Sequence, residues 1–291
     1  MKDFEYVAPK SVDEAVAVLA RHNGTAKLLA GGTDLIVQLR EHLRTADVVV
    51  DVKKIAELME LRVESDGRLW IGAGVPCYRI YGDERIARSH AGLVDAARII
   101  GGWQIQSRAS IGGNLCNASP AADSIPALIA ENATCHIAGP NGRRTLAVAE
   151  FCTAPGKNAL AAGELLVAIE LPAAAPQAAS AYERFIPRNE MDIAVVGAGS
   201  WVKLDPAGNT IAEARIGLGA VAPTPLFAAA ASQFLAGKPA TDESYAQAAE
   251  LAQKIAKPIT DMRGPAEYRT HLVGVLVKRT LATAAARALG K

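Results

Sequence analysis

Short apolar runs, each bounded by glycine, proline or polar residues, recur along the first 171 residues of the chain. Short apolar runs with such residues at both ends are typical of buried strands. They predict strands over residues 4–7, 27–30, 48–52, 69–74 and 165–171. The runs 134–138 and 144–148 flank Asn141-Gly142 and predict a hairpin, because Asn-Gly accepts the positive φ angles of a tight turn.

Helical signals alternate with these strands. Ser11 and Glu14 make a capping box, and the apolar residues that follow lie on one helical face as far as Gly24. Further helices are expected over 35–43 and 81–100. Ser119-Pro120 is typical of an N-cap and the first helical residue, which predicts a helix from about 120 to 131.

The stretch 172–180 is rich in alanine and proline, carries no charge and predicts a domain boundary. Beyond it, strands are expected over 182–186, 193–204 and 211–221, followed by helices over 225–236, 243–256 and 265–289. Strands followed by helices favour an α+β domain with its helices on one face. We therefore expect an α+β protein with domains 1–174 and 181–291, the first divided into subdomains of about 1–55 and 56–174.

The composition of this 291-residue chain, 50% hydrophobic and 21% charged, is ordinary for a soluble globular protein. The net charge of +1 gives no electrostatic reason to expect binding to nucleic acid or to an acidic membrane. The N-terminus lacks the apolar core of a signal peptide, and no apolar run approaches the ~20 residues of a membrane helix. We expect a cytoplasmic protein, with export alongside a partner left open.

The side chains show neither a catalytic constellation nor a metal site. The four cysteines form no CxxC pair and are expected to be small buried thiols: Cys77, Cys116, Cys135 and Cys152. The five histidines are scattered, and no nucleophile lies in a pattern with a base. Trp103 is expected to pack in a core, since aromatic side chains mostly do. The basic residues near the C-terminus are expected on a solvated helix face: Arg263, Arg269, Lys278, Arg279 and Arg287.

Two Gly-Gly pairs stand where a strand or loop leads into a helix. Gly31-Gly32 follows the strand 27–30, and Gly112-Gly113 precedes the helix at Pro120. Glycine lets backbone N–H groups approach a bulky anion closely. Two such turns in one chain indicate either two loops that grip one extended ligand, such as a dinucleotide, or two ordinary tight turns. The Gly-Ala-Gly runs at 72–74 and 197–199 do not complete G-x-G-x-x-G, so no Rossmann domain is expected.

The motifs around these glycines resemble the FAD-binding (medium) subunit of the molybdenum hydroxylases, the family of xanthine dehydrogenase and carbon monoxide dehydrogenase. They are Ala30-Gly31-Gly32-Thr33-Asp34-Leu35, Ser110-Ile111-Gly112-Gly113-Asn114 and Ala118-Ser119-Pro120-Ala121-Ala122-Asp123-Ser124. Arg184 and the segments 191–196, 222–225 and 261–269 are similar to the C-terminal domain of that family. Gln106-Ser107 departs from the usual Arg-Asn pair. The resemblance implies a two-part FAD-binding domain of the vanillyl-alcohol-oxidase (PCMH) type and a smaller α/β-sandwich domain.

The resemblance also implies which residues contact FAD. The first loop would wrap the diphosphate with Leu28, Leu29, Ala30, Gly31, Gly32, Thr33, Asp34 and Leu35. The second would direct backbone donors to the cofactor from Ser110, Ile111, Gly112, Gly113 and Asn114. Asp123 would accept from a cofactor hydroxyl, Leu165 would pack near the flavin, and the charge of Arg184 would favour the reduced flavin. Asp34 is expected to cap its helix with the side chain turned aside from the phosphate.

The function implied by the resemblance is electron transfer. A large molybdopterin subunit would hydroxylate a substrate, and a small subunit with [2Fe-2S] clusters would pass the electrons to FAD in this chain. The flavin would reduce NAD, oxygen, a quinone or another acceptor. Two alternatives remain open: a self-sufficient FAD oxidoreductase of the same type, and a non-catalytic scaffold subunit that has lost its flavin.

Overall fold

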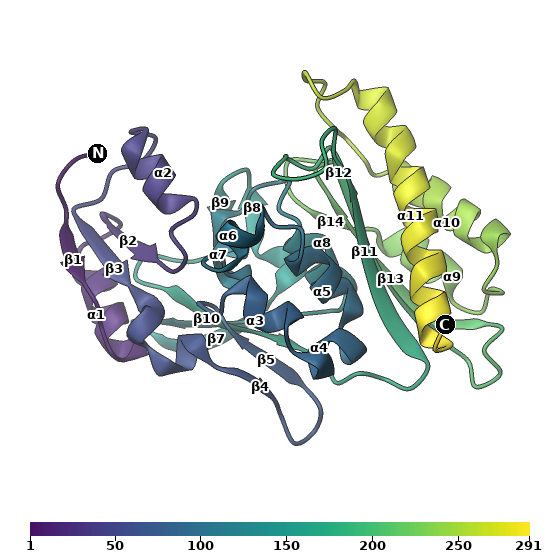
Figure 1. Ribbon diagram of the computed structural model, residues 1–291, viewed down its shortest axis with the longest axis horizontal. Coiled ribbons are helices and arrows are strands. Elements are labelled where there is room, and N and C mark those ends of the chain that lie inside the picture. Colours follow the sequence, from purple (N-terminus) through teal and green to yellow (C-terminus); the bar gives the residue numbers. More distant parts are fainter.

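The computed structural model describes all 291 residues, Met1 to Lys291, and shows an α+β fold with four β-sheets (Figure 1). The strands are β1 (Glu5–Val7), β2 (Ala26–Leu29), β3 (Val48–Asp51), β4 (Leu61–Val63), β5 (Leu69–Gly72), β6 (Thr134–Gly139), β7 (Gly142–Ala147), β8 (Cys152–Ala154), β9 (Lys157–Asn158), β10 (Leu165–Leu171), β11 (Ala178–Phe185), β12 (Val196–Leu204), β13 (Ile211–Gly219) and β14 (Leu226–Phe227).

The α-helices are α1 (Val12–Arg21), α2 (Leu35–Arg40), α3 (Cys77–Tyr81), α4 (Glu84–Ser89), α5 (Ala91–Ala97), α6 (Trp103–Gln106), α7 (Ile111–Asn117), α8 (Ser124–Ala130), α9 (Ala229–Leu235), α10 (Asp242–Gln253) and α11 (Ala266–Ala288). Three 3₁₀ helices are η1 (Val52–Lys54), η2 (Ala56–Met59) and η3 (Val148–Glu150). None of the helices is both long enough and apolar enough to cross a bilayer.

A three-stranded parallel sheet, in the order β1-β3-β2, begins the chain. The predicted capping box starts α1, where Ser11 Oγ accepts from Glu14 N at 3.2 Å. Alternate residues of β3 face opposite sides, so Val48 and Val50 pack with α1 while Val49 packs with Leu39 of α2. Both faces of this strand are therefore buried, as its continuous apolar run predicted.

The central sheet has five antiparallel strands in the order β4-β5-β10-β6-β7. The hairpin predicted at Asn141-Gly142 joins β6 to β7, with Gly139 opposite Gly142. In β10, Leu166 and Ile169 face the core under α3 to α8, whereas Leu165 and Val167 face the N-terminal sheet. This central strand therefore contributes to the two cores that meet in the first half of the chain.

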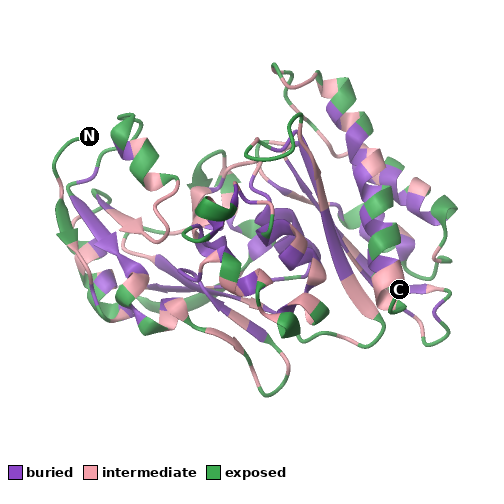
Figure 2. Cartoon of the chain, viewed as in Figure 1, coloured by how far each residue is buried: buried purple, intermediate pink, exposed green.

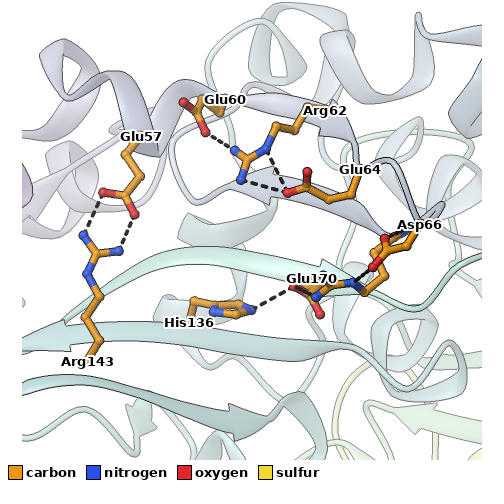
Figure 3. A network of polar contacts seen from close by, with 9 residues as sticks. Glu57, Glu60, Arg62, Glu64, Asp66, His136, Arg143 and Glu170 are labelled. Atoms are coloured by element: carbon orange, nitrogen blue, oxygen red, sulfur yellow. Dashed lines mark hydrogen bonds and ion pairs between the residues drawn. The ribbon is translucent and has the colours of Figure 1, made fainter.

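The central sheet has a second face, which is turned away from α3 to α8. Part of this face carries polar side chains and no hydrophobic core (Figure 3). His136 of β6 lies 3.3 Å from the carboxylate of Glu170 on β10, and Arg143 of β7 pairs with Glu57. Arg62 of β4 pairs with Glu60 and Glu64. Because half-exposed ion pairs are worth about 1 kcal/mol or less each, the buried face supplies most of this sheet's stability.

The last sheet is antiparallel in the order β11-β12-β13-β14, with α9, α10 and α11 on one face and α5 and α8 on the other (Figure 1). Every residue of α8 is buried between the two large sheets (Figure 2). A Cβ at Gly199 would lie 2.7 Å from Pro126 O of this helix, and one at Gly217 would overlap the same atom. The Gly-Ala-Gly run at 197–199 therefore permits close packing and forms no dinucleotide site.

Several predicted helices have different bounds. The segment 81–100 divides into short helices because Asp83 caps α4, accepting from Arg85 N at 2.9 Å. The helix expected from Pro120 begins at Ser124, since Ser119 Oγ accepts from Ala121 N and forms a turn instead. The helix expected over 35–43 ends at Arg40. A short strand, β14, occupies the beginning of the helix expected over 225–236.

Expectations for single side chains were partly wrong. Trp103 is 83% exposed on α6 and does not pack in a core. Arg269 is buried, donating to Val195 O and Asp261, and Arg287 pairs with Asp95, so the basic residues do not all lie on a solvated face. Cys77 and Cys135 are buried, and the other two cysteines are half-buried. Burial raises the pKa of the Cys77 thiol to about 12, so it is unreactive at neutral pH.

Candidate functional site

The first glycine turn connects β2 to α2 and is shaped by two close approaches. Gly32 has φ +80°, a conformation that other residues adopt at a cost. A Cβ on Gly31 would overlap the carbonyl oxygen of Arg108, which lies two residues before the second motif begins at Ser110. The absence of a side chain at Gly31 therefore lets the two motifs touch, although they are far apart in the sequence.

This turn presents a run of unpaired backbone donors. The N–H groups of Gly31, Gly32, Thr33 and Asp34 have no hydrogen-bond acceptor within the chain. Buried or half-buried backbone N–H groups are almost always paired, with protein, water or a ligand. Successive N–H groups in a turn form a concave site for an anion. The turn is therefore suited to hold the oxygens of a phosphate or diphosphate.

Asp34 does not cap α2, contrary to the prediction. Its backbone is already helical, with φ −99° and ψ −50°, and its carboxylate makes no bond to the first turn. An N-cap side chain needs extended backbone to reach the helical N–H groups. Burial raises the pKa of Asp34, and the nearby Arg44 partly offsets that rise. Asp34 therefore places a carboxyl group beside the turn, and the positive charge of Arg44 partly compensates it.

The second motif is the first turn of α7 and not an open loop. Ser110 is the N-cap, with its Oγ accepting from Gly113 N at 3.0 Å. Gly112 packs against the end of β5, where a Cβ would lie 2.5 Å from Ala73 O. Asn114 Oδ1 accepts from Ser124 Oγ at 2.6 Å, which ties α7 to α8. The resemblance implied that Gly113 N–H donates to the cofactor. In the structure this N–H donates to Ser110 Oγ instead.

A cavity of about 370 Å³ lies between the two motifs. This volume is within the range of small-molecule sites, which is about 300–1,000 Å³. The residues expected from the sequence that line it are Leu28, Ala30, Gly31, Gly32, Thr33, Asp34, Leu35, Ser110, Gly112, Gly113 and Asn114. Leu29, Ile111 and Leu165 do not line it but pack in the adjoining hydrophobic clusters.

Sequence reasoning missed part of the cavity wall. Gln38, one turn beyond Asp34 on α2, and Asn117 of α7 both line the cavity. The side-chain amide of Gln38 donates to Asn117 Oδ1 at 3.1 Å. Helical spacing from Asp34 could have identified Gln38. The loop 160–164, which precedes β10, also lines the cavity. It contains no motif and reaches the site only because β10 lies at the centre of its sheet.

Asp123 and Arg184 lie away from the cavity wall, at the junction of α8 and β11. Asp123 Oδ2 accepts from Arg184 Nη1 at 2.6 Å, and its Oδ1 accepts from Tyr182 OH at 3.0 Å. Burial raises the pKa of Asp123 to about 6, while Arg184 and Tyr182 act in the opposite direction. Both carboxylate oxygens therefore have protein partners, and the charge of Arg184 is paired with Asp123. No motif in the sequence pointed to the role of Tyr182.

Comparison with known proteins agrees with this geometry. Residues 2–174 match the family model described as the FAD binding domain in molybdopterin dehydrogenase. The chain belongs to this family of FAD-binding subunits. Residues 180–284 match the CO dehydrogenase flavoprotein C-terminal domain. The fold, cofactor and oxidoreductase class that the resemblance implied are thereby confirmed, with FAD as the cofactor of the family's domain.

Similar proteins cover the whole chain. The carbon monoxide dehydrogenase medium chain of Hydrogenophaga pseudoflava is 36% identical over 98% of each chain. A putative xanthine dehydrogenase FAD-binding subunit of Escherichia coli is 33% identical over 100% of this chain and 99% of that protein. A solved structure of carbon monoxide dehydrogenase from Hydrogenophaga pseudoflava superposes with a TM-score of 0.93 at 36% identity, covering 98% of each chain. These relatives are subunits of multi-subunit dehydrogenases.

The residues present fit a bound FAD. The diphosphate is an anion, and the turn at Gly31 to Asp34 offers it donors that nothing else in the chain uses. The missing side chain at Gly31 lets the Arg108 carbonyl lie against the turn, and Gly32 supplies the positive φ angle that the turn adopts. The cavity offers no nucleophile paired with a base, in accord with a protein that binds and orients a redox cofactor.

Proposed function

We propose that this chain carries FAD as the electron-transfer subunit of a heteromeric molybdenum hydroxylase. It would take electrons from the [2Fe-2S] clusters of a small subunit and pass them to NAD, oxygen, a quinone or another acceptor. The observation that carries the proposal is the run of four unpaired N–H groups at Gly31 to Asp34, which lines one cavity with the second glycine motif. Bound FAD supplies the redox chemistry.

The residues of the chain bind and orient the cofactor in this proposal. The turn at Gly31 to Asp34 donates to the diphosphate, and Thr33 offers a hydroxyl beside it. Gln38 and Asn117 join α2 to α7 and so hold the two motifs at a fixed separation. Asp123, Tyr182 and Arg184 hold β11 against the start of α8, and this fixes how the C-terminal sheet borders the site. Leu165 supports the site from the core beneath it.

The partners and domains form part of the same proposal. The medium-chain relatives favour a large molybdopterin subunit and a small [2Fe-2S] subunit, in a heterotrimer or a dimer of heterotrimers. We propose domain boundaries at 1–174 and 181–291, with a division of the first domain near residue 55. The cytoplasmic location expected from the sequence remains an expectation.

A visible absorption spectrum of the purified chain tests the cofactor assignment. We expect the bands of an oxidised flavin, and release of FAD rather than FMN when the chain is denatured. A colourless chain is then reconstituted with FAD, alone and together with the co-expressed large and small subunits. A chain that stays colourless in the assembled complex contradicts the proposal and favours a scaffold subunit.

Reduction by partners distinguishes electron transfer from a self-sufficient oxidoreductase. In the assembled complex, the flavin bands should bleach when the substrate of the large subunit is added without an acceptor. The isolated flavin-loaded chain should not turn over simple organic substrates, because its cavity has no base paired with a nucleophile. Sustained turnover by the isolated chain would favour the alternative.

A further inference from the structure

An ammonium group contacts the first glycine turn from outside the cavity wall. Lys53, in η1 directly after β3, donates its Nζ to Ala30 O at 3.1 Å and to Asp51 Oδ1 at 2.7 Å. Ala30 lines the cavity, and Lys53 does not. Lys53 therefore acts on the site only through the backbone of the turn.

Lys53 is itself held in place by a buried carboxylate. Asp51 is 6% exposed and accepts from Lys53 N at 2.9 Å and from Tyr6 OH at 2.5 Å. Burial raises the pKa of Asp51, but the bonds from Lys53 and Tyr6 outweigh it and hold the pKa below its usual range. This series of bonds crosses the parallel sheet from β1 through β3 to the end of β2. The ammonium is thus positioned before any ligand arrives.

The geometry of one peptide unit connects Lys53 to the donors of the turn. Ala30 O and Gly31 N–H belong to the same trans peptide and point in opposite directions. A bond that fixes the carbonyl toward Lys53 therefore also fixes the direction of Gly31 N–H, which has no acceptor in the chain. Glycine has little intrinsic preference among backbone conformations, so this peptide would otherwise rotate readily.

We propose that Lys53 is a positioning residue for the cofactor. It locks the peptide between Ala30 and Gly31, keeps the carbonyl dipole away from the anion and directs Gly31 N–H toward the diphosphate. This inference rests on the proposed function, since it takes the ligand of the turn to be FAD. The alternative is that Lys53 only neutralises Asp51 and stabilises the sheet.

Titration of the flavin-free full-length chain with FAD, followed by flavin fluorescence, separates these roles. Lys53→Met should raise the Kd about tenfold, the scale of one charge-assisted hydrogen bond. Lys53→Arg, which keeps the charge and donors, should recover most of the affinity. The matched control is Lys54→Met, because Lys54 is exposed and its side chain makes no bond. It should bind FAD like the wild type.

A second variant keeps the test valid if Lys53→Met fails to fold. Asp51→Asn combined with Lys53→Met removes the unpaired buried carboxylate, so its thermal midpoint without flavin should approach that of the wild type. Its affinity for FAD should remain about tenfold weaker, because the peptide is still unlocked. Wild-type affinity in either the single or the double variant overturns the role of Lys53. A wild-type chain that binds no FAD, alone or with its partners, overturns the proposed function as well.

Discussion

Arg184→Met tests how much the buried ion pair at the junction of α8 and β11 contributes. The Arg184 side chain is 6% exposed, and its Nη1 donates to Asp123 Oδ2 at 2.6 Å. Removing one partner of a buried pair typically costs about 3–5 kcal/mol, since the other charge is left uncompensated. We expect a loss near the lower end of this range, about 3 kcal/mol, in the free energy of unfolding at pH 8.

The loss should depend on pH with a defined sign. Burial already raises the pKa of Asp123 to about 6, above its ordinary value of 3.8. A carboxyl with a raised pKa in the folded chain contributes stability that is complete below its unfolded pKa and is lost as the pH rises through its folded pKa. Without Arg184, the folded pKa rises further. The variant should therefore lose more stability than the wild type between pH 5 and pH 8.

Urea unfolding at pH 5 and pH 8, followed by far-ultraviolet circular dichroism, measures this difference. The gap between wild type and Arg184→Met should be small at pH 5, where the carboxyl is largely protonated, and wide at pH 8. The matched control is Arg279→Met, which removes an exposed pair with Glu183 and should change little at either pH. A gap that is equal at both pH values, or absent, would refute the reasoning.

Three further predictions concern the motifs themselves. Gly31→Ala should abolish FAD retention on gel filtration, because the methyl group would overlap Arg108 O and separate the two motifs; full retention would show that this contact is dispensable. Ser110→Ala should lower the free energy of unfolding by about 0.5–2 kcal/mol in urea titrations, the usual value of an N-cap; an unchanged midpoint would contradict the cap. Trp103→Ala should leave the thermal midpoint unchanged, since this side chain is 83% exposed; a large drop would mean that it packs after all.

The sequence determined the elements whose signals are local. The capping box at Ser11, the hairpin at Asn141-Gly142 and the apolar run of β10 are set by backbone preferences and periodicity within a few residues. The glycine motifs, with the family resemblance, also led to the FAD-binding fold and to the part of the cavity lining that the two motifs supply. Local signals failed at Ser119-Pro120 because a competing turn satisfied the same cap residue.

The tertiary structure decided everything that depends on two distant segments meeting. It brings Gly31 against Arg108, Asp123 against Arg184, and Lys53 under Ala30. Each of these contacts joins residues from different elements, and nothing near either residue in the chain specifies the other. It also leaves Trp103 exposed, because burial depends on which elements pack over a residue and not on its own apolar surface. The sequence therefore determines which kinds of residue are present at the site, and the packing of distant segments determines which of them contact one another.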